Sequence, residues 1–267
     1  MKLVVIGAGH LGYHLAVQLA QSEKDILVAN HQENVVLQAL QKEGIPTINN
    51  LKEIPSDAEV YVLCVKDDCI AKVVQKLIHK VSETAVVLHT SGAVPSDVLQ
   101  IFKHYGVLYP LYSFSFSIKT INWKTIPFYY VANDKSAESK ILQIAKSLNG
   151  EALQIQKVED AQKLFIHLLA VFANNFTNAL MHSIYELSQS EQSQVSHLYE
   201  RMTEFSIRTI QRTKDKNPAW FQTGPAIRKD NQTIKKHIEI LKKFPDIQKM
   251  YQCFTEYIQH HIKHAEK

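Results

Sequence analysis

The sequence predicts an α/β fold in two domains: a Rossmann fold, which is a doubly wound parallel sheet, followed by an all-α C-terminal domain. Over the first half of the chain, short apolar segments alternate with amphipathic ones, which is typical of a parallel sheet covered by helices. A glycine-rich turn separates the first two segments. After about residue 155 the strand patterns give way to long helical ones. We therefore expect a dinucleotide-binding domain over 1–154 and a helical domain over 155–267.

The elements of the first domain follow from hydrophobic spacing. Residues 2–6 form a continuous apolar run and are predicted to be a buried strand. In residues 10–21, Leu11, Leu15 and Leu19 recur at the spacing of one helix face. The same two patterns predict strands and helices further along the chain, namely strands at 26–29, 46–48, 59–65, 85–89, 106–109 and 128–132 and helices at 32–43, 68–80 and 136–148.

The second domain is predicted to consist of helices alone. Its first helix, 158–188, contains no glycine and no proline, and further helices are expected at 193–214, 230–243 and 246–264. The last of these ends in three histidines, His260, His261 and His264. We interpret them as a solvated helix end, with metal binding as the lesser alternative.

Composition excludes several classes of protein. With 45% apolar and 21% charged residues in a chain of 267, a dominantly disordered protein is excluded. Three cysteines are too few and too irregular for a disulfide framework, and they suit a reducing cytoplasm. We see neither a basic leader nor an unbroken apolar run of the ~20 residues that span a bilayer. The net charge of +4 comes from lysines interleaved with acids, so neither a membrane nor a nucleic acid is the expected partner.

A glycine motif directly follows the first strand and opens the first helix, and it reads Gly7-Ala8-Gly9-His10-Leu11-Gly12. In that context G-x-G-x-x-G predicts a dinucleotide site. Gly7 permits the tight turn, Gly9 lets a pyrophosphate approach the backbone, and Gly12 lets the helix pack close to the strand. The alternative is a glycine turn in a domain that binds no nucleotide.

The end of the second strand indicates which nicotinamide cofactor is used. An acidic residue there would bind the ribose 2′-hydroxyl of NAD. This chain has Asn30 and His31, and its first carboxylate comes only at Glu33. This favours NADP, with NAD retained as possible, since the arginine expected for a 2′-phosphate is also missing. A polar loop that touches no ligand is the alternative.

Two later strand ends are expected to border the same cofactor, because ligands bind at the carboxyl ends of parallel strands. Val65 and Lys66 follow one strand, and Thr90 and Ser91 follow the next. Asp68 is interpreted as the N-cap of the helix after it.

An aromatic and hydroxyl-rich segment runs from Val107 to Phe116 around Tyr109-Pro110. It is expected either to line a pocket or to form an edge strand with an aromatic core.

The helix 158–188 carries a polar stripe. At about 100° per residue, Asn174 and Asn178 lie within about 20° of His167, and the opposite side is apolar. A helix that is apolar nearly all round is expected to be buried, with its stripe facing the nicotinamide. Two alternatives stay open: the asparagines bond to neighbouring helices, or His167 is a satisfied core histidine.

A second motif of the helical domain is Thr223-Gly224-Pro225, followed by Arg228 and Asp230. Arg228 is a candidate clamp for a carboxylate or phosphate, because its guanidinium is a planar fork of donors. The alternative is a structural pair with Asp230, the expected cap of the next helix.

Taken in order, six segments resemble one family: GAGHLG, VKDD, HTSGA, YPLYSFS, KLFIHLLAVFANN and TGPAIRKDNQTIKKH. The chain resembles Rossmann-like proteins with a C-terminal DUF2520 domain. Relatives of these include pyrroline-5-carboxylate reductases, F420-dependent NADP oxidoreductases, 3-hydroxyacid dehydrogenases and the 6-phosphogluconate dehydrogenase C-terminal-like superfamily. The resemblance implies a nicotinamide-binding domain, a helical dimerising domain and an oxidoreductase of unassigned substrate.

The chain departs from these relatives at two positions. Tyr109 stands where a histidine is expected before the proline, and Lys163 is followed four residues later by His167 rather than by asparagine. The chemistry of the hydroxyacid dehydrogenases is therefore not carried over.

From these observations we expect a homodimeric oxidoreductase that transfers hydride between NADP(H) and a small carbonyl, imine or hydroxyacid. His167 is assigned as the proton donor, Asn174 as the group that orients substrate or nicotinamide, and Ser91 as a substrate hydrogen-bonding group. Substrate contacts are assigned to Asn178, Arg228 and Tyr109. The competing interpretation is a dinucleotide-binding or sensing protein without catalysis.

Overall fold

The computed structural model describes residues 1–22, 25–150, 154–190, 195–214 and 216–262. The chain divides into two compact units, Met1–Asn174 and Asn175–Lys267. Each unit is described by itself.

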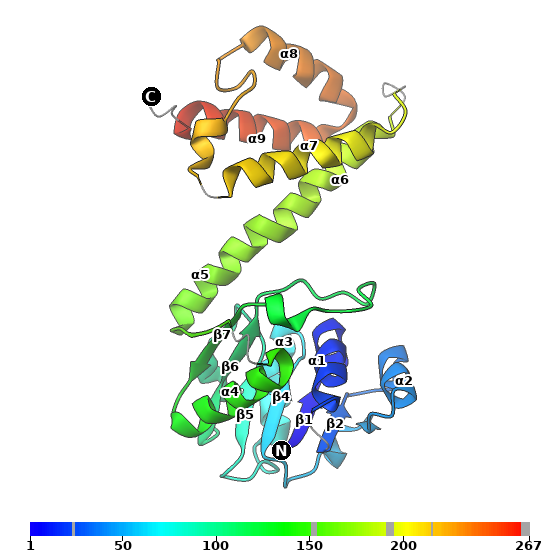
Figure 1. Cartoon of the computed structure of the whole chain (residues 1–267), viewed down its shortest axis with the longest axis vertical. Helices are drawn as coiled ribbons and strands as arrows, with labels where there is room; N and C mark the ends of the chain where they lie inside the picture. Colours follow the sequence, from blue (N-terminus) through cyan, green and yellow to red (C-terminus); the bar gives the residue numbers. More distant parts are fainter. Residues whose placement is uncertain (23–24, 151–153, 191–194, 215, 263–267) are drawn as a thin grey trace. The chain divides into compact units, whose positions relative to one another are not determined.

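The first unit is built on one sheet of eight strands in the order β3-β2-β1-β4-β5-β6-β7-β8 (Figure 1). Its strands are β1 (Lys2–Ile6), β2 (Asp25–Ala29), β3 (Thr47–Ile48), β4 (Val60–Leu63), β5 (Val86–His89), β6 (His104–Pro110), β7 (Phe128–Ala132) and β8 (Ile155–Lys157). The predicted parallel sheet is confirmed from β3 to β6. The expectation is wrong at one place, since β7 runs antiparallel to β6, with Tyr109 opposite Tyr129.

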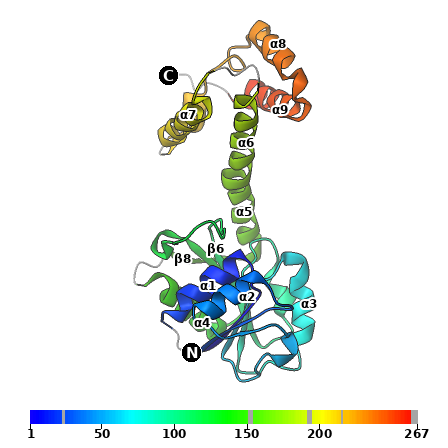
Figure 2. The same ribbon diagram turned by 90° about the vertical axis from the view of Figure 1, so that its right-hand side faces the viewer.

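Helices cover both faces of this sheet, as expected. One apolar core contains side chains of α1 (His10–Ala20), α2 (Val35–Lys42) and α4 (Lys135–Asn149). The other core contains side chains of α3 (Asp67–Leu77) and of the short helix η2 (Ser96–Leu99). Figure 2 shows α3 on one side of the sheet and α1, α2 and α4 on the other. The strands β4 and β5 are buried along their whole length, which explains their continuous apolar runs.

The first compact unit extends past residue 154, where the sequence predicted the domain boundary. The strand β8 pairs in parallel with β7, so the sheet continues beyond that point. The strand was not predicted, because three residues with two polar side chains carry no apolar run. The helix α5 (Asp160–Ala170) also belongs to this unit.

The second unit contains α6 (Thr177–Ser188), α7 (Leu198–Thr213), α8 (Asn231–Ile240) and α9 (Pro245–His261). Asp230 caps α8 as expected, since its carboxylate accepts hydrogen bonds from the Thr233 N–H (3.1 Å) and hydroxyl (2.7 Å). His260 and His261 lie in the last turn of α9, and His264 lies outside the described residues. No group of three or more metal-ligating side chains is found among the residues that the structure describes.

One helix, Asp160–Ser188, runs through α5, a π-helical turn at Val171–Phe176 and α6. Its length and composition would suffice to cross a membrane, a test that core helices of soluble proteins also pass. The described residues of this single chain leave the helix uncovered, although it is expected from its sequence to be buried. Its apolar side chains are 42–59% exposed, namely Leu164, Phe165, Leu168, Leu169, Phe172, Phe176 and Leu180.

Candidate functional site

The glycine loop between β1 and α1 shows why each glycine is present. Gly7 has φ +113°, and a Cβ there would lie 2.6 Å from the Cys64 carbonyl oxygen. A Cβ at Gly12 would lie 2.0 Å from the Gly7 carbonyl oxygen. The fold itself therefore requires both of these glycines. Gly9 differs, because it has an ordinary extended conformation and a Cβ there would meet no atom within 4 Å.

A pocket of about 550 Å³ opens beside this loop, at the carboxyl ends of β1, β2 and β4. Seven of the predicted cofactor residues line it: Gly7, Ala8, Gly9, Asn30, His31, Val65 and Lys66. The other five do not line it: His10, Leu11, Gly12, Thr90 and Ser91. The ends of three neighbouring strands, β1, β2 and β4, therefore border one cavity.

His10 is turned toward a different segment. Its Nδ1 lies 3.1 Å from the Phe114 carbonyl oxygen, and its ring meets the Phe116 ring edge-on at 4.2 Å. The neighbouring His14 repeats the contact, with Nε2 2.9 Å from the Ser115 carbonyl oxygen. The predicted aromatic segment therefore packs over the first turns of α1. The Nδ1 atom of His10 is directed to this segment and not to the pocket.

The end of β2 is organised by two asparagines. The Asn30 amide is buried and donates to the Gln32 carbonyl oxygen at 2.8 Å, so this donor is used inside its own turn. Asn34 caps α2, since its side-chain oxygen accepts from the N–H groups of Val36 and Leu37. His31 is exposed and lines the pocket.

The helix α3 supplies a pocket wall that the sequence analysis missed. Cys69, Lys72, Val73 and Lys76 all line the cavity, and their spacing of three, four and seven residues places them on one helix face. That spacing could have been recognised in the sequence. The prediction for Asp68 is wrong, because the N-cap of α3 is Lys66 and Asp68 lies in the first turn.

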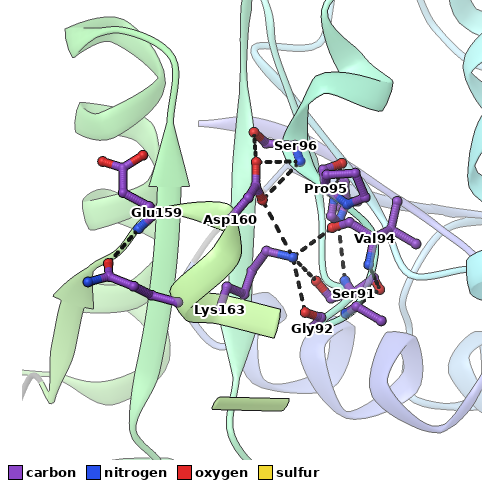
Figure 3. Close-up of polar contacts among 11 residues, drawn as sticks. Ser91, Gly92, Val94, Pro95, Ser96, Glu159, Asp160 and Lys163 are labelled. Atoms are coloured by element: carbon purple, nitrogen blue, oxygen red, sulfur yellow. Dashed lines mark hydrogen bonds and ion pairs between the residues drawn. The ribbon is translucent and has the colours of Figure 1, made fainter. Parts of the chain in front are cut away.

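The turn after β5 is held by a buried lysine (Figure 3). The Lys163 side chain is 0% exposed. Its ammonium donates to three carbonyl oxygens, those of Ser91 (3.3 Å), Gly92 (3.1 Å) and Val94 (2.6 Å). Three acceptors match the three donors of an ammonium group. The lysine therefore ties α5 to a turn about seventy residues earlier in the chain.

Asp160 completes this clamp from the first turn of α5. Its carboxylate lies 3.6 Å from the Lys163 ammonium. It also accepts from the Ser96 N–H at 2.9 Å and from the Ser96 hydroxyl at 2.6 Å. Burial lowers the pKa of Lys163, and the negative charge of Asp160 opposes that shift.

His89 supports the same turn from the sheet. It is 0% exposed, and burial, followed by the nearby charge of Lys163, lowers its pKa to about 4. The imidazole is therefore neutral at pH 7. Its Nδ1 accepts from the Ser91 N–H at 3.2 Å, and its Nε2 lies 3.3 Å from the Pro95 carbonyl oxygen, to which the neutral ring donates.

Ser91, a predicted catalytic residue, has a structural task in this turn. Its hydroxyl oxygen accepts from the N–H groups of Ala93 (3.1 Å) and Val94 (3.0 Å). The hydroxyl proton is still available as a donor. The neighbouring Thr90 hydroxyl donates to the Leu63 carbonyl oxygen at 3.3 Å.

The structure brings Tyr109, Gly92 and His167 together. The Tyr109 hydroxyl lies 3.3 Å from His167 Nδ1. A Cβ on Gly92 would lie 2.8 Å from His167 Nδ1 and 2.8 Å from the Tyr109 ring, so a larger residue there would displace one of these side chains. Burial raises the pKa of Tyr109, which is therefore a neutral phenol at pH 7. The pair can hold and pass a proton between Oη and Nδ1.

Three other predicted residues, Asn174, Asn178 and Arg228, are exposed in the units to which they belong. The predicted stripe assumed one uniform helix, but the π-helical turn 171–176 shifts the phase between His167 and Asn178. Asn174 lies in that turn and is exposed. Asn178 and Arg228 belong to the second unit and are exposed there. The charge of Arg228 helps Thr233 to lower the pKa of Asp230.

Comparisons with known proteins agree with this geometry. Residues 2–92 match the family of F420-dependent NADP oxidoreductases, and residues 126–258 match the DUF2520 family, a domain of unknown function. A search of curated proteins gave no match.

Solved structures resemble the chain over nearly its whole length. A Bacteroides fragilis protein classed as an NADP oxidoreductase is 28% identical, with a TM-score of 0.86 and 97% of each chain covered. A Coxiella burnetii pyrroline-5-carboxylate reductase is 16% identical, with a TM-score of 0.55 and 96% of this chain and 98% of that one covered. A Plasmodium falciparum pyrroline carboxylate reductase with NADP bound is 10% identical, with a TM-score of 0.57 and coverage of 97% and 98%.

The fold and the glycine pocket thus define a nicotinamide dinucleotide-binding protein of the oxidoreductase-like Rossmann class. The model of NADP oxidoreductases matches residues 2–92 and the DUF2520 model matches residues 126–258, which confirms the resemblance predicted from the motifs.

Proposed function

We propose that this protein is an NADP(H)-dependent oxidoreductase of the cytoplasm, which exchanges hydride with a small carbonyl, imine or hydroxyacid. The observation that carries the proposal is Gly9. The backbone conformation and the surroundings of Gly9 would accept a side chain, so the fold gives no reason for glycine there. Close approach of a bound pyrophosphate does give one.

Two further features of the pocket support a dinucleotide. The loop leads directly into the N-terminus of α1, where no side chain of the described residues caps the helix, and the N–H groups of a first helical turn suit a pyrophosphate. No carboxylate stands among the described residues that line the pocket, and this favours NADP over NAD. When bound, the cofactor supplies hydride chemistry, and the protein supplies orientation and a proton.

The proton that accompanies hydride transfer is assigned to the pair of Tyr109 and His167. Their 3.3 Å contact joins a neutral phenol to an imidazole, so a proton lost from one member can be replaced from the other. His167 remains the assigned proton donor, and the Ser91 hydroxyl remains the group that hydrogen-bonds to the substrate. Asn174 remains the group that orients substrate or nicotinamide, and Asn178 and Arg228 remain candidate substrate contacts.

Replacing Gly9 by valine is expected to abolish binding of NADPH and NADH while the fold stays intact. A Cβ at this position meets no atom of the protein within 4 Å, so we expect the fold to accept valine and the side chain to occupy the place of the pyrophosphate. Calorimetry measures the affinity, and circular dichroism with thermal unfolding checks the fold.

Gly12→Ala is the informative contrast, because its Cβ would collide with the backbone of Gly7. This variant is expected to lose thermal stability and binding together. Unchanged NADPH affinity in folded Gly9→Val would refute the cofactor assignment. Binding of NADPH by the parent without oxidation in the presence of a panel of carbonyls and imines would favour the sensing alternative.

We also propose a homodimer formed mainly by residues beyond 155. The support is the exposed apolar face of the long helix, since contiguous apolar surface of this kind marks interaction sites. Light scattering at micromolar concentration is expected to give twice the chain mass of 30.5 kDa. Replacing Phe165 and Leu169 by glutamate should shift the mass toward that of one chain. A parent protein that scatters as a monomer would contradict the proposal.

A further inference from the structure

The helix α3 presents two lysines to the cofactor pocket from the wall opposite the end of β2. Lys72 and Lys76 are one helical turn apart and line the cavity together with His31 from the β2 end. Both lysines are exposed. Lys66, at the N-cap of the same helix, is a third lysine among the lining residues.

The charge of this pocket has one sign. Three lysines line it, and none of its described lining residues is an aspartate or a glutamate. Other lysines of the first unit pair with acids: Lys2 lies 2.6 Å from Asp57, and Lys140 lies 2.5 Å from Glu59. In the described part of the chain, Lys72 and Lys76 form no such ion pair. Their charges are therefore available to an anion in the pocket.

The usual donors at the ribose position are insufficient here. The Asn30 amide is used by the Gln32 carbonyl, and Asn34 caps α2 and reaches the Ala8 carbonyl oxygen at 3.4 Å. No arginine lines the pocket among the described residues. On the β2 side, the described lining residues are Asn30, His31 and Asn34, and none of them is a lysine or an arginine. A dianionic 2′-phosphate bound there would therefore have to be neutralised from elsewhere in the pocket.

We propose that Lys72 and Lys76 form the binding site for the 2′-phosphate of NADP(H), so that cofactor selectivity is set from α3 across the pocket. Two ammonium groups at one-turn spacing suit a dianionic phosphate, which lysines bind as point charges. The inference rests on the proposed dinucleotide function and adds the residues that choose between NADPH and NADH.

The experiment measures calorimetric affinities for NADPH and NADH in the parent protein and in a Lys72→Gln, Lys76→Gln double variant. NADPH affinity is expected to fall roughly ten- to hundredfold, the range for losing charged hydrogen bonds. NADH affinity is expected to stay within about twofold, because NADH has no 2′-phosphate. As simpler probes, 2′-AMP should lose affinity in the variant and 5′-AMP should keep it.

A matched control removes the same charge elsewhere. Lys135 and Lys146 are exposed on α4, whose core side chains lie on the other face of the sheet from those of α3. Lys135→Gln with Lys146→Gln should leave both affinities unchanged. If the control lowers NADPH affinity as much as the α3 variant does, the effect comes from net charge alone and the proposal is overturned.

The remaining outcomes are separable. Equal weakening of NADPH and NADH would place the lysines on the shared part of the cofactor and overturn the inference, as would no change in either. A parent protein that binds neither nucleotide would refute the proposed function itself. A parent that binds NADPH, with selectivity unaltered in the variant, would refute only the role of the lysines.

Discussion

Replacement of Lys163 by methionine is expected to lower the free energy of unfolding of the first unit by about 3–5 kcal/mol, the range for breaking a buried charged pair. Methionine fills most of the volume but leaves the carbonyls of Ser91, Gly92 and Val94 without their donor. It also leaves Asp160 without its positive neighbour. Each buried polar group left unpaired adds a desolvation cost.

Urea unfolding followed by tryptophan fluorescence measures this effect. Trp123 is buried in the first unit, whereas Trp220 lies exposed in the second. A Trp220→Phe background therefore lets the remaining tryptophan report the first unit alone.

Lys157→Met is the control for this measurement. Lys157 is an exposed lysine paired with Glu138 at 3.4 Å, and its loss is expected to cost under about 1 kcal/mol. A comparably small loss for Lys163→Met would show that the turn after β5 does not depend on the clamp.

Replacement of His167 by alanine is expected to lower turnover by about 10²–10⁴-fold once a substrate is in hand, the usual effect of losing a general acid. NADPH affinity should barely change, because His167 does not line the cofactor pocket. The variant also removes the partner of the Tyr109 hydroxyl. Tyr109→Phe is expected to lower turnover as well, since it removes the other member of the pair.

The control is His182→Ala on the same long helix. His182 is exposed and lies 3.9 Å from Glu186, so turnover should not change. Steady-state oxidation of NADPH and thermal unfolding are measured for each variant. If His167→Ala melts early but turns over at the parental rate per folded molecule, the histidine is a core residue and its assignment is wrong.

Much of the first unit could be predicted from local patterns. Strands β1, β2, β4, β5, β6 and β7 and helices α1 to α4 lie at or within a few residues of their predicted places. The glycine loop was also predictable, because a strand, a tight turn and a helix follow one another directly in sequence. Seven of the residues expected to bind the cofactor line one pocket for the same reason: parallel strands end at one edge of the sheet.

Two expectations about the long helix depended on features that a sequence pattern does not record. The stripe of His167, Asn174 and Asn178 assumed a uniform helical period, and the π-helical turn at 171–176 breaks it. The long helix was expected to be buried because its residues are apolar nearly all round. Hydrophobicity alone does not indicate whether residues of the same chain or of a second copy bury these side chains.

The sequence by itself determined the fold class, the order of strands and helices along the chain, and the glycine site, because these depend on residues within a few positions of one another. Tertiary structure alone decided that Lys163 holds the turn at Ser91–Val94, that Tyr109 meets His167, and that α3 turns two lysines toward the pocket. Each of these contacts joins segments about forty to seventy residues apart. Periodicity records which face of an element is apolar, but only the order of strands in the sheet and the packing of helices on it decide which distant side chains meet.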